Sequence, residues 1–195
     1  AFKQGVLLAE TYEKVTPRPD PTGWWLSEKL DGVRAYWNGK NFYSRNGLLF
    51  DAPEWFKKGL PSDVHLDGEL WCGREQFERC VRIIKYHKGS TAAEWAHLVF
   101  LCFDAPSVRG NEALAYEDRH DAIISATTNT KYAAPVGIRK CTGQAHLAEL
   151  LGDVLHSGGE GLMLRQPKSK YVRTRSSSLL KVKAFLDTEA RVCGH

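Results

Sequence analysis

Residues 24–34, Trp-Trp-Leu-Ser-Glu-Lys-Leu-Asp-Gly-Val-Arg, are the stretch from which the fold and chemistry of this chain can be worked out. The aromatic and aliphatic residues at its start predict a strand, and Asp31-Gly32 predicts the turn that ends it. Side chains alternate along a strand, so one face is expected to carry Trp25, Ser27, Lys29 and Asp31. Nearby cations or burial can lower the pKa of a lysine and make it a nucleophile, although an isolated lysine–aspartate pair is more often a simple surface pair.

The size and composition are those of an ordinary globular protein. The 195 residues, 43% hydrophobic and 26% charged, suffice for one domain and the start of another. The net charge of +4 permits a polyanionic partner without requiring one. No apolar run reaches the roughly 18 residues of a membrane span, so no membrane partner is expected. The chain begins with alanine, which leaves room for a removed export signal and leaves the compartment open between cytoplasm and bacterial periplasm.

The cysteines and histidines argue against disulfides and a histidine-ligated metal. The five cysteines are odd in number and form no CxxC pair, so we expect free thiols and small core residues. The seven histidines form no HxH or HExxH pair.

Periodicity and turn signals predict an antiparallel meander followed by alternating helices and strands. A hairpin is expected from strands at 33–37 and 41–45 joined at Asn38-Gly39. Further strands are predicted at 64–71, 98–103, 161–165 and 179–185. Helices are predicted at 51–56, 76–85, 117–125 and 147–155. Residues 166–178 are expected to form a polar, basic loop.

Several carboxylates and one aromatic residue are candidates for a nucleotide site. Asp67 and Glu69 lie two apart on a predicted strand and could hold magnesium or a ribose hydroxyl, although paired exposed carboxylates are usually only solvated. Phe103 ends a buried strand, where core packing is a serious alternative. Glu160 stands where the chain re-enters a strand, and a glutamate is electrostatically disfavoured at the preceding helix C-terminus.

The last third of the chain is rich in cations. Lys181 and Lys183 share a face of an apolar strand, which is costly unless they meet an anion such as a triphosphate, or unless they protect a sheet edge. Residues 166–183 contain no acid, and their cations are Lys168, Lys170, Arg173, Arg175, Lys181 and Lys183. Such a segment can bind a phosphate backbone, although basic loops are often merely solvated.

Together these segments resemble the nucleotidyltransferase (adenylation) domain of ATP-dependent DNA ligases, most closely the minimal bacterial ligases. The matching segments, in family order, are Lys29-x-Asp31-Gly32-x-Arg34, Ser44-Arg45-Asn46-Gly47, Asp67-Gly68-Glu69-Leu70, Phe103-Asp104, Glu160–Arg165 and Lys181-x-Lys183. The resemblance implies an α+β, ATP-grasp-like nucleotidyltransferase core of antiparallel sheets flanked by helices, with the nucleotide between the sheets. It assigns residues 1–186 to the adenylation domain and 187–195 to the start of a truncated C-terminal OB-fold domain.

The resemblance also implies a role for each candidate residue. Lys29 would take AMP from ATP, Asp31 would orient it, and Arg34 would contact the nucleotide or the nick phosphate. Ser27 and Glu28 would belong to the nucleotide site, Phe103 would stack on adenine, and Asp67 would be structural. Magnesium would be held near Glu69 and Glu160, and Lys181 and Lys183 would bind the α-phosphate and assist transfer. The expected DNA contacts are Arg45, Lys168, Lys170, Arg173 and Arg175.

The expected partner is nicked double-stranded DNA, bound by a monomer that uses ATP and Mg²⁺. RNA ligases and mRNA-capping guanylyltransferases share the KxDGxR segment and remain alternatives, although the Ser44–Gly47 segment favours a DNA ligase. A non-catalytic nucleic-acid-binding module of the same fold is the alternative outside enzymes. Without the OB-fold domain and its last motif, an isolated core is expected to be impaired in self-adenylation and nick sealing.

Overall fold

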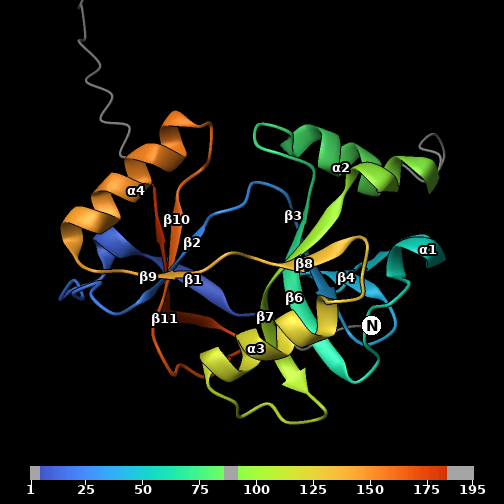
Figure 1. The fold of residues 1–195 in the computed structure, drawn as a ribbon, viewed down its shortest axis with the longest axis horizontal. Coiled ribbons are helices and arrows are strands. Elements are labelled where there is room, and N and C mark those ends of the chain that lie inside the picture. The colour runs from blue at the N-terminus through green and yellow to red at the C-terminus, as the bar shows by residue number, and fades with distance from the viewer. Residues whose placement is uncertain (1–4, 86–91, 184–195) are drawn as a thin grey trace, which may run out of the picture.

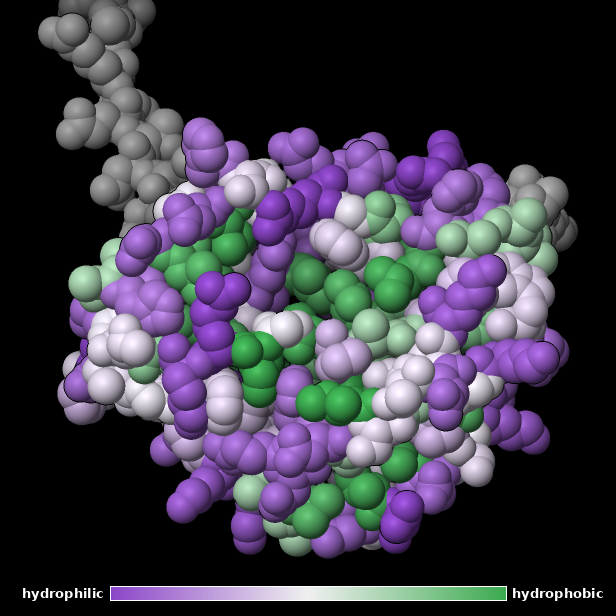
Figure 2. Space-filling view, in the orientation of Figure 1, coloured by the Kyte–Doolittle hydropathy of each residue, from purple (hydrophilic) through white to green (hydrophobic). Residues whose placement is uncertain are grey.

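The computed structural model describes residues 5–85 and 92–183, which form two β-sheets side by side with helices packed around them (Figure 1). The five-stranded sheet has the order β1 (Leu8–Thr11), β11 (Arg175–Val182), β10 (Leu162–Arg165), β2 (Trp25–Glu28) and β9 (Arg139–Lys140). The six-stranded sheet has the order β5 (Leu49–Phe50), β4 (Phe42–Ser44), β3 (Val33–Trp37), β6 (Val64–Trp71), β7 (Val99–Val108) and β8 (Ala133–Pro135). The surface between the sheets is hollowed, and hydrophobic residues show in the hollow (Figure 2).

Most neighbouring strands are antiparallel, which confirms the predicted fold class, but two pairings are parallel. These are β1 with β11 and β7 with β8. The predicted hairpin is present, because Asn38 Oδ1 accepts hydrogen bonds from the backbone N–H groups of Lys40 and Asn41 and closes the turn between β3 and β4. The register of β3 on β6 sets Arg34 opposite Glu69, so that two residues of the expected site are brought together by strand pairing.

Each sheet has its own hydrophobic core, covered by different helices. The helices are α1 (Glu54–Lys57), α2 (Phe77–Lys85), α3 (Tyr116–Thr127) and α4 (Gln144–His156), with 3₁₀ turns η1 (Tyr12–Lys14) and η2 (Ala92–His97). Apolar side chains of α1, α2 and α3 pack on the six-stranded sheet, and those of α4 pack on the five-stranded sheet (Figure 1). None of the helices in the described ranges is long and apolar enough to cross a bilayer.

The predicted loop at 166–178 is wrong at its C-terminal end, because β11 already begins at Arg175. Leu8 and Ala9 pair with Arg175 and Ser176, so a distant strand extends a serine-rich segment that has no strand pattern of its own. The prediction of free thiols is confirmed for four cysteines, Cys72, Cys80, Cys102 and Cys141. Cys193, the end of the strand predicted at 179–185, and the segment 187–195 lie outside the described residues.

Candidate active site

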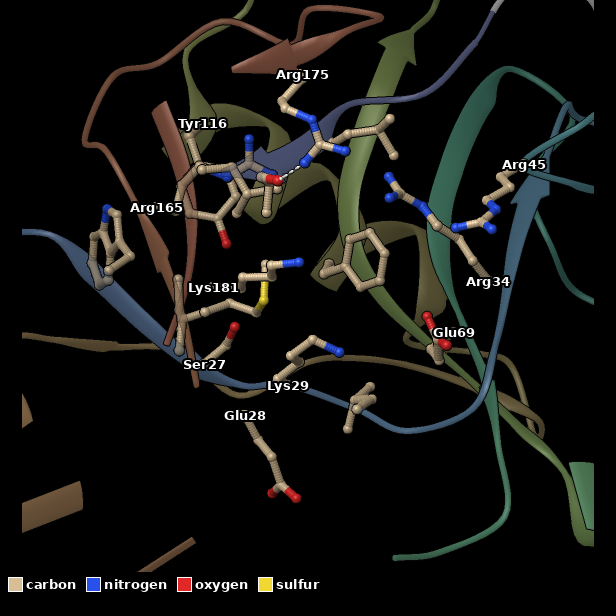
Figure 3. A pocket seen from close by; sticks show the side chains of 18 residues that line it. Ser27, Glu28, Lys29, Arg34, Arg45, Glu69, Tyr116, Arg165, Arg175 and Lys181 are labelled. Carbon is tan, nitrogen blue, oxygen red and sulfur yellow. Dashed lines mark hydrogen bonds between the residues drawn. The ribbon is translucent and has the colours of Figure 1, made fainter. Parts of the chain in front are cut away.

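A pocket of about 310 Å³ lies between the two sheets and is lined by residues of both (Figure 3). Trp25, Ser27, Arg165 and Lys181 come from the five-stranded sheet, while Arg34, Glu69 and Phe103 come from the six-stranded sheet and Tyr116 begins α3. In the close view, Arg34, Arg45 and Glu69 lie on the side of the pocket opposite Tyr116 and Arg165. The volume is at the lower end of the range usual for small-molecule sites.

Lys29 lies at the floor of this pocket, directly after the end of β2. Its backbone N–H donates to the Gly161 carbonyl at 2.9 Å, and its Nζ lies 2.5 Å from Glu160 Oε2. Lys183 Nζ donates to the other oxygen of the same carboxylate, so Glu160 bridges two lysines. Burial acts to raise the pKa of the Glu160 carboxyl, but the hydrogen bonds from Lys183 and Lys29 outweigh it and the net shift is downward.

The expectation that Asp31 shares a face with Lys29 is wrong. The strand ends at Glu28, so the alternation of side chains does not reach Asp31, which lines a separate hollow beside α2. No hydrogen bond joins the side chains of Asp31 and Lys29, both of which the structure describes. Glu28 borders the pocket, but its carboxylate points away from it and accepts two hydrogen bonds from Arg74, at 2.8 and 2.9 Å (Figure 3).

Arg34 is held in place by Asp67. The Asp67 carboxylate is fully buried and accepts two hydrogen bonds from Arg34, at 2.9 and 2.6 Å, and one from the Tyr171 hydroxyl at 2.6 Å. The Arg34 guanidinium also lies 5.2 Å from the centre of the Phe103 ring. Phe103 lines the pocket and is not part of the hydrophobic core, so its ring is accessible to a base bound in the pocket.

Glu69 lines the pocket on the side of the six-stranded sheet. Burial raises the pKa of its carboxyl to about 8, against the opposing effects of Arg34 and Lys29. Within residues 5–85 and 92–183 no group of three or more histidine, cysteine, aspartate or glutamate side chains could hold a metal. Glu69 and Glu160 both interact with Lys29, and Mg²⁺ needs only one or two carboxylates when substrate phosphates complete its shell.

The predicted phosphate-binding lysines occupy different places. Lys181 lines the pocket from β11, and burial, Lys183 and Lys29 lower its pKa. Lys183 follows the end of that strand and reaches the site through Glu160 rather than by lining the pocket. Lys183 therefore meets an anion already in the protein, the carboxylate of Glu160, whereas Lys181 adds to the positive charge around Lys29.

The residues predicted to contact DNA divide into three groups. Arg45 and Arg175 are exposed but also line the pocket, and Arg175 donates to the Ala9 carbonyl (Figure 3). Lys168 and Lys170 are exposed in the loop before β11 and lie outside the pocket. Arg173 folds back instead, with its guanidinium 2.9 Å from Glu112 and a side chain only 20% exposed, so the structure gives it an internal ion pair.

Sequence reasoning missed several residues that line the pocket. Met163 and Arg165 alternate with two buried leucines of the predicted strand at 161–165, so the alternation of that strand could have identified them. Tyr116 gave no such signal, because α3 brings it to the pocket from a separate part of the chain. The same holds for Ile138, which arrives on the segment between β8 and β9.

Comparisons with known proteins identify the family of this chain. The family model described as ATP dependent DNA ligase domain matches residues 7–183. A DNA ligase of Haemophilus influenzae is 38% identical over 175 residues, which cover 89% of this chain and 62% of that protein. The bifunctional non-homologous end joining protein LigD of Bacillus subtilis is 29% identical over 220 residues, covering 95% of this chain and 35% of that protein. The chain thus spans less than two thirds of the length of these curated relatives.

Solved structures show the same relationship. A structure from an analysis of Lig E DNA ligases as a minimal DNA-binding scaffold superposes with a TM-score of 0.83 and 35% identity, covering 92% of this chain and 68% of that one. The ATP complex of the bacteriophage T7 ATP-dependent DNA ligase gives a TM-score of 0.70 at 18% identity, covering 93% of this chain and 69% of that chain, and this similarity shows the fold alone. The match over residues 7–183 and the identity to ligases show that the chain belongs to the ATP-dependent DNA ligase domain family.

Proposed function

We propose that this chain is the catalytic core of an ATP-dependent DNA ligase and that Lys29 is its nucleophile. The observation that carries the proposal is the position of Lys29 Nζ in a pocket between the sheets, among Glu160, Lys183 and Lys181. In the first step, Nζ loses a proton and attacks the α-phosphorus of ATP. A P–N bond forms, the bond to the leaving oxygen breaks, and pyrophosphate departs.

The surrounding residues supply positioning and charge for this step. The Lys29 ammonium and Glu160 Oε2 are 2.5 Å apart, so this carboxylate holds Nζ at the floor of the pocket until the nucleotide arrives. Lys181 and Arg34 place positive charge where phosphate oxygens would lie, and Phe103 offers a ring for the base. When bound near Glu69 and Glu160, Mg²⁺ would offset charge on the phosphates.

The later steps require a nick in double-stranded DNA. AMP passes from Lys29 to the 5′-phosphate, and the 3′-hydroxyl then attacks that phosphate and releases AMP. Arg45 and Arg175 at the pocket rim and Lys168 and Lys170 outside it are the proposed DNA contacts. In this proposal the intact enzyme is a monomer with a C-terminal OB-fold domain, and it seals nicks during DNA repair, replication or recombination.

Intact mass spectrometry tests the proposal. The parent chain should gain the mass of one AMP when ATP and Mg²⁺ are added, whereas Lys29→Ala should gain nothing. Lys40→Ala is a matched control, because Lys40 is an exposed turn residue that does not line the pocket. If the parent fails to gain AMP, a chimera that carries the remainder of the Haemophilus influenzae ligase repeats the test, and a second failure overturns the proposal.

Substrate choice separates the ligase from its relatives. A DNA ligase core should prefer ATP to GTP and, in the chimera, seal a nick between DNA strands faster than one between RNA strands. Preference for GTP would instead indicate a capping-type guanylyltransferase, and preference for an RNA nick would indicate an RNA ligase. If Lys29→Ala changed no activity, the non-catalytic binding module would be the better description.

A further inference from the structure

One wall of the pocket carries a buried tyrosine to which no role has been given. Tyr116 is the first residue of α3 and is only 3% exposed, yet its hydroxyl points into the pocket, toward Ser27 in the close view (Figure 3). None of the residues in the described ranges forms a hydrogen bond with this hydroxyl. The hydroxyl oxygen itself is accessible from the pocket, so a bound ligand can supply its hydrogen-bond partner.

The tyrosine ring packs against two arginines that share one carboxylate. The guanidinium carbons of Arg165 and Arg119 lie 4.9 and 5.7 Å from the ring centre. Both arginines donate to the fully buried Asp104, and Arg119 also donates to the carbonyls of Leu114 and Ser169. This packing restricts the position of the ring before any ligand binds, which reduces the entropy cost of binding.

The electrostatics keep this hydroxyl neutral. Burial raises the pKa of Tyr116 to about 12, so the group stays protonated at physiological pH. A neutral hydroxyl can donate one hydrogen bond and accept others at the same time. It is therefore suited to a ligand edge on which a donor and an acceptor lie side by side.

Arg165, the cation beside the Tyr116 ring, is already paired with Asp104 at 2.7 Å, so the groups that this end of the pocket offers a ligand favour a base over a phosphate. Trp25 and Met163 also line the pocket, and the Trp25 indole N–H is already bonded to Glu117, the neighbour of Tyr116, at 2.7 Å. The cations Lys29, Lys181 and Arg34 line other parts of the pocket (Figure 3). Among purines, adenine presents the acceptor N7 beside a 6-amino donor, whereas guanine presents two acceptors there.

We propose that the Tyr116 hydroxyl hydrogen-bonds the N7 and 6-amino edge of the adenine of bound ATP and so contributes to the choice of ATP over GTP. The inference rests on the proposed function, since it requires that the pocket bind a nucleotide. It assigns Tyr116 to recognition of the base, whereas Lys29 and its neighbours act on the phosphates.

Equilibrium binding to the 195-residue chain tests the inference without requiring catalysis. Dissociation constants are measured for ATP, GTP, 7-deaza-ATP and the triphosphate of purine riboside, which lacks the 6-amino group. Tyr116→Phe removes only the hydroxyl. Tyr132→Phe is the matched control, because Tyr132 packs on Phe56 outside the pocket.

We expect Tyr116→Phe to weaken ATP binding about 5- to 10-fold, to narrow the preference for ATP over GTP, and to leave the fold unchanged by circular dichroism. For 7-deaza-ATP or the purine riboside triphosphate, or for both, Tyr116→Phe should weaken binding less than twofold, because the analogue already lacks the atom that the hydroxyl contacts. Tyr132→Phe should bind like the parent. The inference would be overturned if Tyr116→Phe bound ATP as tightly as the parent does. It would also be overturned if Tyr116→Phe weakened the binding of both analogues as much as it weakens the binding of ATP. If neither the parent chain nor the Haemophilus influenzae chimera bound ATP, the proposed function would be overturned together with the inference.

Discussion

Asp104 is the carboxylate on which the buried wall of the pocket depends. It accepts hydrogen bonds from Arg119 at 2.6 and 3.1 Å, from Arg165 at 2.7 Å and from the backbone N–H of Ala105 at 2.9 Å, and it is fully buried. Asp104→Asn keeps the shape but leaves two buried guanidinium groups without their counter-charge. Removing one partner of a buried ion pair costs about 3–5 kcal/mol, a large part of the roughly 5–15 kcal/mol that stabilises a typical domain.

Urea denaturation followed by circular dichroism measures this cost. The midpoint should fall by about 1–2.5 M, given a slope of about 2–3 kcal/mol per molar for a domain of this size. Asp63→Asn is the matched control, because Asp63 is 58% exposed and lies 3.4 Å from the exposed Arg109, a pair worth at most about 1 kcal/mol. If the two variants lost equal stability, the reasoning that one carboxylate holds both buried arginines would be refuted.

Three further changes test other parts of the site. Burial raises the pKa of Glu69 to about 8, above the unfolded value of 4.5, so its contribution to stability is full below about pH 4.5 and is lost as the pH rises through 8. Denaturation measured from pH 5 to 9 should show this loss of stability in the parent but not in Glu69→Gln. Parallel stability profiles of the two proteins would contradict the prediction. In Gly32→Ala the new Cβ would lie 2.4 Å from the Leu70 carbonyl oxygen and 2.9 Å from Glu69 Cγ. We therefore expect the free energy of unfolding, measured by urea denaturation, to fall by about 1–3 kcal/mol. Unchanged stability would show that the neighbouring strand moves aside without cost. Replacing Lys168 and Lys170 by alanine should lower the slope of log Kd for nicked DNA against log salt by about two while ATP affinity stays constant, and an unchanged slope would remove both lysines from the DNA contacts.

The local sequence pattern was sufficient to predict a strand or turn wherever the residues of that element determine its structure. The strand at Val64–Trp71 was predicted with its observed bounds, because flanking turn residues mark both ends. The hairpin after Arg34 was predicted for the same reason, since Asn38-Gly39 fixes the turn. Pattern failed where a distant partner decides the structure, as at Arg175, which becomes a strand residue by pairing with Leu8.

The candidate site shows the same division. The resemblance carried by the motifs brought Lys29, Glu160 and Lys183 to one site, but no local pattern could show that one carboxylate joins both lysines. Asp31 was misplaced because a strand face was extended past its last residue. Arg173 was grouped with exposed cations because charge alone cannot show that a side chain folds back onto an acidic partner.

The central claim is that Lys29 is the nucleophile, and peptide mapping of the adenylated lysine tests it most directly. Lys29 and Lys181 both line the pocket, and Lys183 shares Glu160 with Lys29, so intact mass alone does not identify the nucleophile. The chain is incubated with ATP and Mg²⁺, digested at neutral pH and analysed by tandem mass spectrometry. The account predicts AMP on Lys29 alone, in the parent and at a reduced level in Lys181→Ala. AMP on Lys181 or Lys183 would contradict it.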